Sequence, residues 1–68
     1  MDVMAFEVCR HRRDDCWIVR LDNEVYGSYL DREQALLDAV EAARDALQSG
    51  REAQVWVRDH SNAAARVL

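Results

Sequence analysis

The chain has 68 residues and a mass of 7.9 kDa, so we expect one domain over residues 1–68. Hydrophobic residues make up 50% of it and charged residues 32%, a balance that argues against a disordered tail. The net charge of −4 disfavours general binding to nucleic acid, because an acidic surface repels phosphates. No apolar run approaches the ~20 residues of a membrane helix, and no signal peptide is recognisable, so we expect a cytoplasmic protein.

The first half of the chain predicts three strands. Over positions 4–9, Met4, Phe6 and Val8 alternate with Ala5, Glu7 and Cys9, and this period of two is typical of a half-buried strand. Residues 16–21 and 25–29 give two further strand segments. Asp22 and Asn23 separate the second and third segments, and both residue types tolerate the positive φ of a tight turn. The pattern therefore predicts an antiparallel meander.

The second half begins with a helix. Asp31 is a suitable N-cap residue, and apolar side chains then recur at steps of three and four as far as Leu47, which gives one apolar stripe. Gly50 suits the left-handed position that follows many helices. Alternation over residues 53–58 predicts a fourth strand, and residues 65–68 are a candidate for a short last strand.

These elements predict an α+β domain: a three-stranded antiparallel meander, one helix, and then one or two further strands, with the helix packed on one sheet face. Side-chain alternation assigns Trp17, Val19, Leu21, Val55 and Val57 to the face that the helix covers. We expect Trp17 to be the central side chain of the core.

The opposite parity leaves a second set of side chains on the uncovered face, namely Cys9, Cys16, Ile18, Arg20, Trp56 and Arg58. Ile18 and Trp56 would form an apolar patch there, a feature typical of interaction sites. An arginine stem or the terminal segment could instead cover Trp56. Leu37 lies off the apolar stripe of the helix and is a further candidate contact.

The sequence offers no set of residues arranged for catalysis. Ser28, Ser49 and Ser61 each suit a structural position, next to a helix cap, at a helix end and in a turn. No glycine-rich phosphate loop is present, and so short a chain has little volume for a substrate pocket. We predict no enzyme, no catalytic residue and no cofactor.

A metal site is conceivable only from scattered ligands. Cys9, His11, Cys16 and His60 are enough ligands for zinc, but their spacing fits none of the paired zinc motifs, so we predict no metal site. A hairpin centred on residues 12–13 would place the two cysteines opposite each other, where a disulfide is geometrically conceivable. In a reducing compartment we expect two free thiols.

The only basic cluster is the run of residues 10–13. Arg10, Arg12 and Arg13 could contact phosphates while an aromatic ring stacks on a base. The acidic pair at residues 14–15 follows directly and cancels much of the field. We interpret the run as a solvated hairpin tip and do not expect direct nucleic-acid binding.

Two family resemblances are visible. Trp17-x-Val19, Tyr29, Asp31-x-x-Gln34-Ala35, the helical alanines and Val55-x-Val57 together resemble a family of short bacterial domains of unknown function. That resemblance implies a ββαβ-type fold and no established activity. A looser one is to HicB-type antitoxins, which share a strand meander followed by a helix opening with an E-A-L segment, at Gln34-Ala35-Leu36 here.

The favoured functional hypothesis is a small, acidic, non-enzymatic domain that binds a protein partner, or a second copy of itself, through the uncovered sheet face. Its candidate contact residues are Ile18, Arg20, Leu37, Trp56 and Arg58. The alternative is an antitoxin-like or phage-type inhibitor of host defence, which would occupy a basic groove of a nucleic-acid-binding protein. Its candidate acidic residues are Asp38, Glu41 and Asp45.

Overall fold

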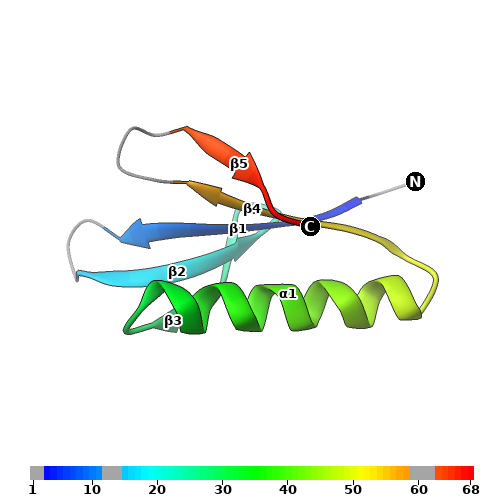
Figure 1. Cartoon of the computed structure of the whole chain (residues 1–68), viewed down its shortest axis with the longest axis horizontal. Helices are drawn as coiled ribbons and strands as arrows, with labels where there is room; N and C mark the ends of the chain where they lie inside the picture. Colours follow the sequence, from blue (N-terminus) through cyan, green and yellow to red (C-terminus); the bar gives the residue numbers. More distant parts are fainter. Residues whose placement is uncertain (1–2, 12–14, 59–62) are drawn as a thin grey trace.

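A computed structural model describes residues 3–11, 15–58 and 63–68 of the chain (Figure 1). Its elements are, in order, β1 (Val3–His11), β2 (Cys16–Leu21), β3 (Glu24–Tyr29), α1 (Arg32–Gln48), β4 (Glu52–Arg58) and β5 (Ala64–Arg66). The described residues thus form five strands and one helix, and the predicted α+β class is confirmed.

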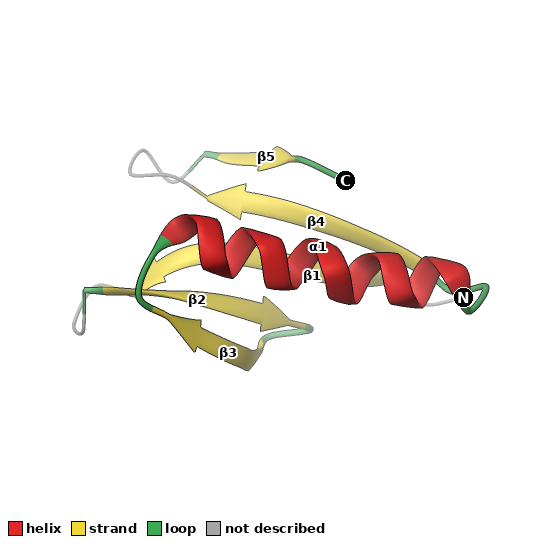
Figure 2. Cartoon of the chain, turned by 60° about the horizontal axis from the view of Figure 1, so that its bottom comes forward, coloured by secondary structure: helices red, strands yellow, loops and turns green. Residues whose placement is uncertain are grey.

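The sheet is mixed, with the strand order β3-β2-β1-β4-β5. The predicted meander is present, since β1 pairs with β2 and β2 with β3 in antiparallel fashion. The positions of the last two strands in the sheet were not predicted. β4 lies beside β1 and parallel to it, and β5 is antiparallel to β4. A parallel pair needs a long crossover, and α1 provides it by running along one face of the sheet (Figure 2).

The turn between β2 and β3 follows the prediction. Asp22 and Asn23 both have positive φ, 53° and 70°, as a two-residue type I′ hairpin turn requires. Leu21 and Glu24 then face each other across the strand pair. This tight connection fixes the register of β3 on β2.

Both predicted ends of the helix are observed. At its start, the backbone of Asp31 is extended and its carboxylate accepts a hydrogen bond from the backbone N–H of Gln34 at 2.8 Å. At its end, Gly50 has φ of 83°, and the backbone N–H of Arg51 donates to the carbonyl of Ala46 at 2.9 Å. This arrangement satisfies carbonyls that a helix end would otherwise leave unpaired.

The predicted covered face is correct, but its centre is not Trp17. Val19, Val55 and Val57 are buried, whereas Trp17 and Leu21 are half-buried and pack against the edge of the core. The largest fully buried side chains are Phe6, Val8, Val19 and Val55. β1 is the central strand, and Val19 of β2 pairs with its buried residue Val8. Trp17 lies nearer the start of β2, where it pairs with Tyr29 of the edge strand β3.

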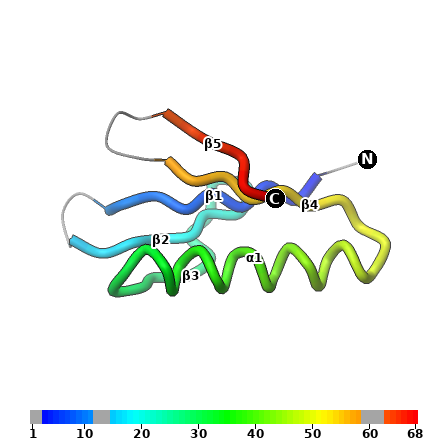
Figure 3. The backbone as a smooth tube through the Cα atoms, in the orientation of Figure 1, coloured from blue at the N-terminus to red at the C-terminus, as the bar shows by residue number. Residues whose placement is uncertain are grey.

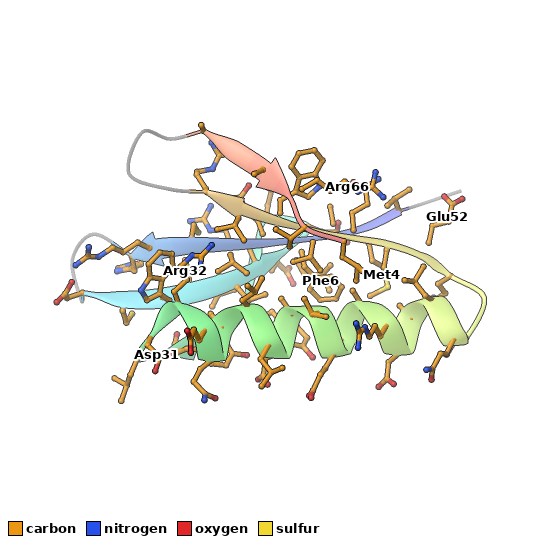
Figure 4. All side chains as sticks on the ribbon, viewed as in Figure 1. Met4, Phe6, Asp31, Arg32, Glu52 and Arg66 are labelled. Carbon is orange, nitrogen blue, oxygen red and sulfur yellow. The ribbon has the colours of Figure 1, made fainter. Side chains whose placement is uncertain are left out.

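Alanines bring the helix close to this core. The buried residues of α1 are Ala35, Ala39, Ala43 and Ala46, and short side chains at these positions let the helix backbone approach the sheet. Figure 4 shows Met4 and Phe6 projecting from the sheet toward α1. Among the described elements, α1 packs against β1 to β4 and not against β5.

The pairing of β1 with β2 corrects one prediction. Cys9 lies opposite Ile18, and Cys16 lies opposite His11, so the two cysteines are diagonal neighbours and not a facing pair. The register is displaced by two residues along β2 from a hairpin centred on residues 12–13. Both cysteines are free thiols, as expected.

The chain ends beside β4 (Figure 3). The last strand begins one residue earlier than predicted and is shorter, covering Ala64–Arg66. Beyond it, the backbone N–H of Val67 donates to the carbonyl of Val55 at 2.8 Å, and the N–H of Val55 donates to the carbonyl of Leu68 at 3.3 Å. No helix in the described part of the chain is long and apolar enough to cross a membrane.

Candidate functional site

The sheet face opposite α1 carries a concave site of about 490 Å³, which we call the central hollow. Its lining residues are Ala5, Glu7, Arg20, Asp22, Asn23, Trp56, Arg58 and Ala64. Three of the five predicted contact residues, Arg20, Trp56 and Arg58, therefore line one depression. They come from two strands, β2 and β4, and the central strand β1 separates them.

The register of the sheet explains this convergence. Glu7 of β1 pairs with Arg20 of β2 on one side and with Trp56 of β4 on the other. The same row continues to Arg66 of β5 and to Val25 of β3. Residues that pair directly across strands project from the same face, so this row crosses the whole uncovered face.

An ion pair fixes the middle of the hollow. The guanidinium of Arg58 donates to the Glu7 carboxylate at 3.1 Å, and both side chains are about one third exposed. The hydrogen bond and the charge of Glu7 raise the pKa of Arg58. Because the pair is partly exposed, we regard it mainly as a positioning contact.

Trp56 is half-buried beside that pair. Its indole N–H donates to the side-chain oxygen of Gln54 at 3.0 Å. This bond satisfies the ring's single donor within the chain, which leaves the exposed part of the ring available for apolar or stacking contacts. Trp56 thus combines a fixed orientation with accessible aromatic surface.

The two remaining predicted contact residues lie outside the hollow. Ile18 is on the same sheet face but is only 5% exposed, so it contributes little surface and does not form the predicted exposed patch with Trp56. Leu37 is 54% exposed and belongs to α1, on the opposite side of the sheet. The structure therefore does not join Leu37 to the other four candidates.

Glu7, Asp22 and Asn23 were missed as site residues. Their signal in the sequence was weak, because a glutamate at an alternating strand position and a two-residue turn both have ordinary structural explanations. Only the placement of β4 beside β1 brings Glu7 next to Trp56 and Arg58. That adjacency is a long-range property of the fold.

The thiol next to the hollow is poorly suited to nucleophilic chemistry. Burial and the nearby carboxylate of Glu7 raise the pKa of Cys9, while the charges of Arg20 and Arg58 oppose this shift. A raised pKa lowers the fraction of reactive thiolate at neutral pH.

The possible metal ligands do not form a cluster where the structure describes them. Over residues 3–11, 15–58 and 63–68, no group of three or more histidine, cysteine or acidic side chains could hold a metal ion. His11 and Cys16 face each other, and Cys9 is diagonal to Cys16 and two residues from His11 along β1. His60 lies outside the described residues.

The candidate acidic residues lie on α1. Three acidic residues, Asp38, Glu41 and Asp45, are exposed on the helix. Because they are spaced by three and four positions, they lie along one flank of it. The hydroxyl of Tyr29 donates to Asp38 and helps to raise the pKa of Tyr29 to about 12, after the larger effect of burial. Asp45 lines a second depression, between α1 and the sheet, together with Tyr26 and Met4.

The basic run at residues 10–13 is described only at its start. Arg10 forms an ion pair with Asp15, which agrees with the interpretation that acidic neighbours offset this cluster. Arg12 and Arg13 lie outside the described residues.

The chain matches no protein-family model, and comparisons with curated proteins and with solved structures found no significant match. The resemblances to short bacterial domains and to HicB-type antitoxins accordingly stay predictions.

Proposed function

We propose that the protein is a non-enzymatic interaction domain, acting in the cytoplasm, that binds a protein partner through its uncovered sheet face. The observation that carries this proposal is the convergence of Arg20, Trp56 and Arg58 in the central hollow. Tryptophan and arginine are the residue types most enriched at energetically important contacts between proteins. A half-buried indole beside arginine side chains therefore suits the centre of an interface.

The second support is the contrast between the two sheet faces. One face is covered by α1 and closed, with Phe6, Val8, Val19 and Val55 fully buried. No helix of the described residues lies over the other face, and its polar side chains are held in place by the Glu7–Arg58 and Trp56–Gln54 contacts. Contacts fixed before binding reduce the conformational entropy that association costs.

Capture of partners from the native cell lysate tests the proposal. The purified chain is compared with Trp56→Gln in the hollow and with Leu37→Gln, an exposed apolar residue on the opposite side of the molecule. We expect Trp56→Gln to lose the captured partner and Leu37→Gln to retain it, with folding of both variants checked by circular dichroism. Retention by Trp56→Gln would contradict the proposal.

The same variants distinguish a second copy of the chain from a different partner. Sedimentation of the purified protein over a range of concentrations reports self-association directly. If the wild type forms a dimer that Trp56→Gln dissociates, the partner is the chain itself. If the wild type stays monomeric, the partner is another protein.

The competing proposal is an inhibitor of a nucleic-acid-binding protein, acting through its acidic helix flank. Its support is that Asp38, Glu41 and Asp45 share one exposed flank of α1. Such binding would weaken steeply with salt, since exposed charges are screened within about 10 Å at 0.1 M ionic strength. Loss of capture by Glu41→Gln, with retention by Trp56→Gln, would favour this alternative.

A further inference from the structure

We propose that the central hollow recognises a segment of the partner that carries carboxylate side chains, so that an aspartate or glutamate binds Arg20 while a neighbouring apolar residue packs on Trp56. This inference rests on the proposed function and specifies the chemistry of its partner. It depends on the distribution of charge over the two sides of the molecule and on which arginines are already paired.

The acidic character of the chain is concentrated on the helix side. From the N-cap onward, α1 carries Asp31, Glu33, Asp38, Glu41 and Asp45 against Arg32 and Arg44. The acidic excess behind the net charge of −4 therefore lies largely on the helix side of the molecule, and not on the uncovered sheet face.

The uncovered face carries arginine in its central row. Arg20 and Arg66 lie in the same cross-strand row as Glu7 and Trp56, and Arg58 lies two residues along β4 from Trp56. Figure 4 shows Arg66 on the side of the sheet away from α1. Glu52, the other strand carboxylate on this face, is four residues from Trp56 along β4, or about 13 Å.

The arginines differ in what they already bind. Arg58 is paired with Glu7, and the side chain of Arg66 donates to the carbonyl of Leu68 at 2.9 Å. Arg20 is exposed, and no carboxylate among the described residues lies within ion-pair distance of it. A guanidinium offers five donors and can bind a carboxylate through two of them, so Arg20 is the position where a partner's carboxylate fits.

The shape of the site favours a projecting segment. The central hollow is concave and holds about 490 Å³, so a flat surface would leave it empty. Asp22 and Asn23 of the β2–β3 turn close one rim. A peptide segment can place one carboxylate on Arg20 and keep its other side chains clear of Asp22 and Glu7.

A nucleic acid strand fits this surface less well. It brings a negative charge with every nucleotide, and Glu7, Asp22 and Glu52 on or beside the path across the face would repel those phosphates. A peptide with one or two carboxylates meets the arginines without this repeated repulsion. We therefore assign an acidic peptide segment, and nucleic acid becomes an outcome of the test.

The test is a selection of peptides from a random display library on the immobilised full chain. We expect the recovered peptides to be enriched in aspartate or glutamate next to an apolar residue. Their affinity is then measured on Arg20→Gln and on Arg44→Gln, which makes the same change of charge on the exposed outer side of α1. We expect Arg20→Gln to weaken binding roughly ten-fold, the loss of about one charge-assisted hydrogen bond, and Arg44→Gln to leave it unchanged.

Several results would overturn the inference: no enrichment in carboxylates, equal loss in the two arginine variants, or tighter binding of single-stranded oligothymidylate that Arg20→Gln abolishes. Self-association of the purified chain that Arg20→Gln removes would also overturn it, because the occupant would then be a second copy. Trp56→Gln separates this failure from failure of the proposed function. If the recovered peptides lack carboxylates but still bind Trp56→Gln more weakly than the wild type, the central hollow is the binding site and only the proposed preference for carboxylates is wrong.

Discussion

The two faces of β1 differ in burial, although they belong to the same nine-residue strand. On the covered side, Phe6 and Val8 are 1% and 0% exposed; on the other side, Glu7 and Cys9 are half-buried. Burial under α1 provides most of the hydrophobic stabilisation, since that free energy scales with apolar area removed from water. The uncovered side is organised instead by specific polar contacts, such as the Glu7–Arg58 ion pair.

The largest expected effect comes from removing an aromatic ring on the covered side. Phe6→Ala should cost about 3–5 kcal/mol of unfolding free energy, because the site is enclosed and cannot collapse fully around the cavity. Phe6 also makes an edge-to-face contact with Tyr26, with ring centroids 5.6 Å apart. In a domain of this size the loss would lower the melting temperature by well over 10 °C, which thermal unfolding followed by circular dichroism would measure.

Trp56→Ala is the matched change on the uncovered side. It removes a larger ring, but that ring is only half-buried, so we expect a loss of only about 1–2 kcal/mol. Equal destabilisation by the two substitutions would show that both faces contribute equally to the core, and the contrast between them would be wrong.

Much of this contrast was predictable from local alternation. The parity of Trp17, Val19 and Leu21 in β2, and of Val55 and Val57 in β4, correctly indicated the face toward the helix. A strand pattern reports which residues share a face because the side-chain period is two. It carries no information on which residues of neighbouring strands pair with each position, so Trp17 was wrongly placed at the centre of the core, which Val19 of the same strand occupies.

The candidate site was predictable only in part for the same reason. Arg20, Trp56 and Arg58 were assigned to one face from parity, but their meeting at Glu7 depends on the parallel pairing of β1 with β4. That pairing is made by the crossover helix and joins residues far apart in the sequence. The register of Cys9 and Cys16 was also wrong, because the geometry of the connection, not alternation, sets which residues face each other.

The rim of the covered side has little free space. A Cβ atom added at Gly27 would lie 2.5 Å from the Tyr29 hydroxyl oxygen and 3.0 Å from the ring carbon that bears it. Gly27→Ala must therefore displace the Tyr29 ring, at a cost of about 1–3 kcal/mol. Chemical denaturation would measure this loss.

Ser28→Ala is the neighbouring control for that substitution. Ser28 is exposed and projects to the uncovered side opposite Ile18, so its removal should change stability by no more than about 0.5 kcal/mol. If Gly27→Ala were tolerated as well as Ser28→Ala, the Tyr29 ring would have room to move and the rim would not be closed.

A smaller effect is expected at the start of α1, the element that makes the two faces unequal. Asp31→Ala removes the acceptor for the N–H of Gln34 and should cost about 1 kcal/mol, as for other N-caps. Asp31→Asn keeps an oxygen acceptor and should retain most of that stability. If urea denaturation finds the two substitutions equally harmful, the charge of Asp31 and not its hydrogen bond is what matters.

The smallest effect at neutral pH involves the Tyr29 hydroxyl, which joins the rim of the sheet to α1. Burial, the hydrogen bond to Asp38 and the charge of Asp38 raise the pKa of Tyr29 from 10.0 to about 12. A folded-state pKa above the unfolded value means that the stabilising contribution is complete below pH 10 and is lost as the pH rises through 12. The free energy of unfolding should therefore fall across this window, and Tyr29→Phe should make it less steep.

The chain has two tyrosines, so replacing one of them assigns the titration to the other. In a Tyr26→Phe background, tyrosinate absorbance reports Tyr29 alone, and its midpoint should lie well above that of a free tyrosine. Adding Asp38→Asn removes the carboxylate that favours the protonated hydroxyl, so the midpoint should move down toward the ordinary value while remaining above it because burial persists. An unchanged midpoint would mean that Asp38 does not contact Tyr29, and that the acidic flank of α1 is entirely free for a partner.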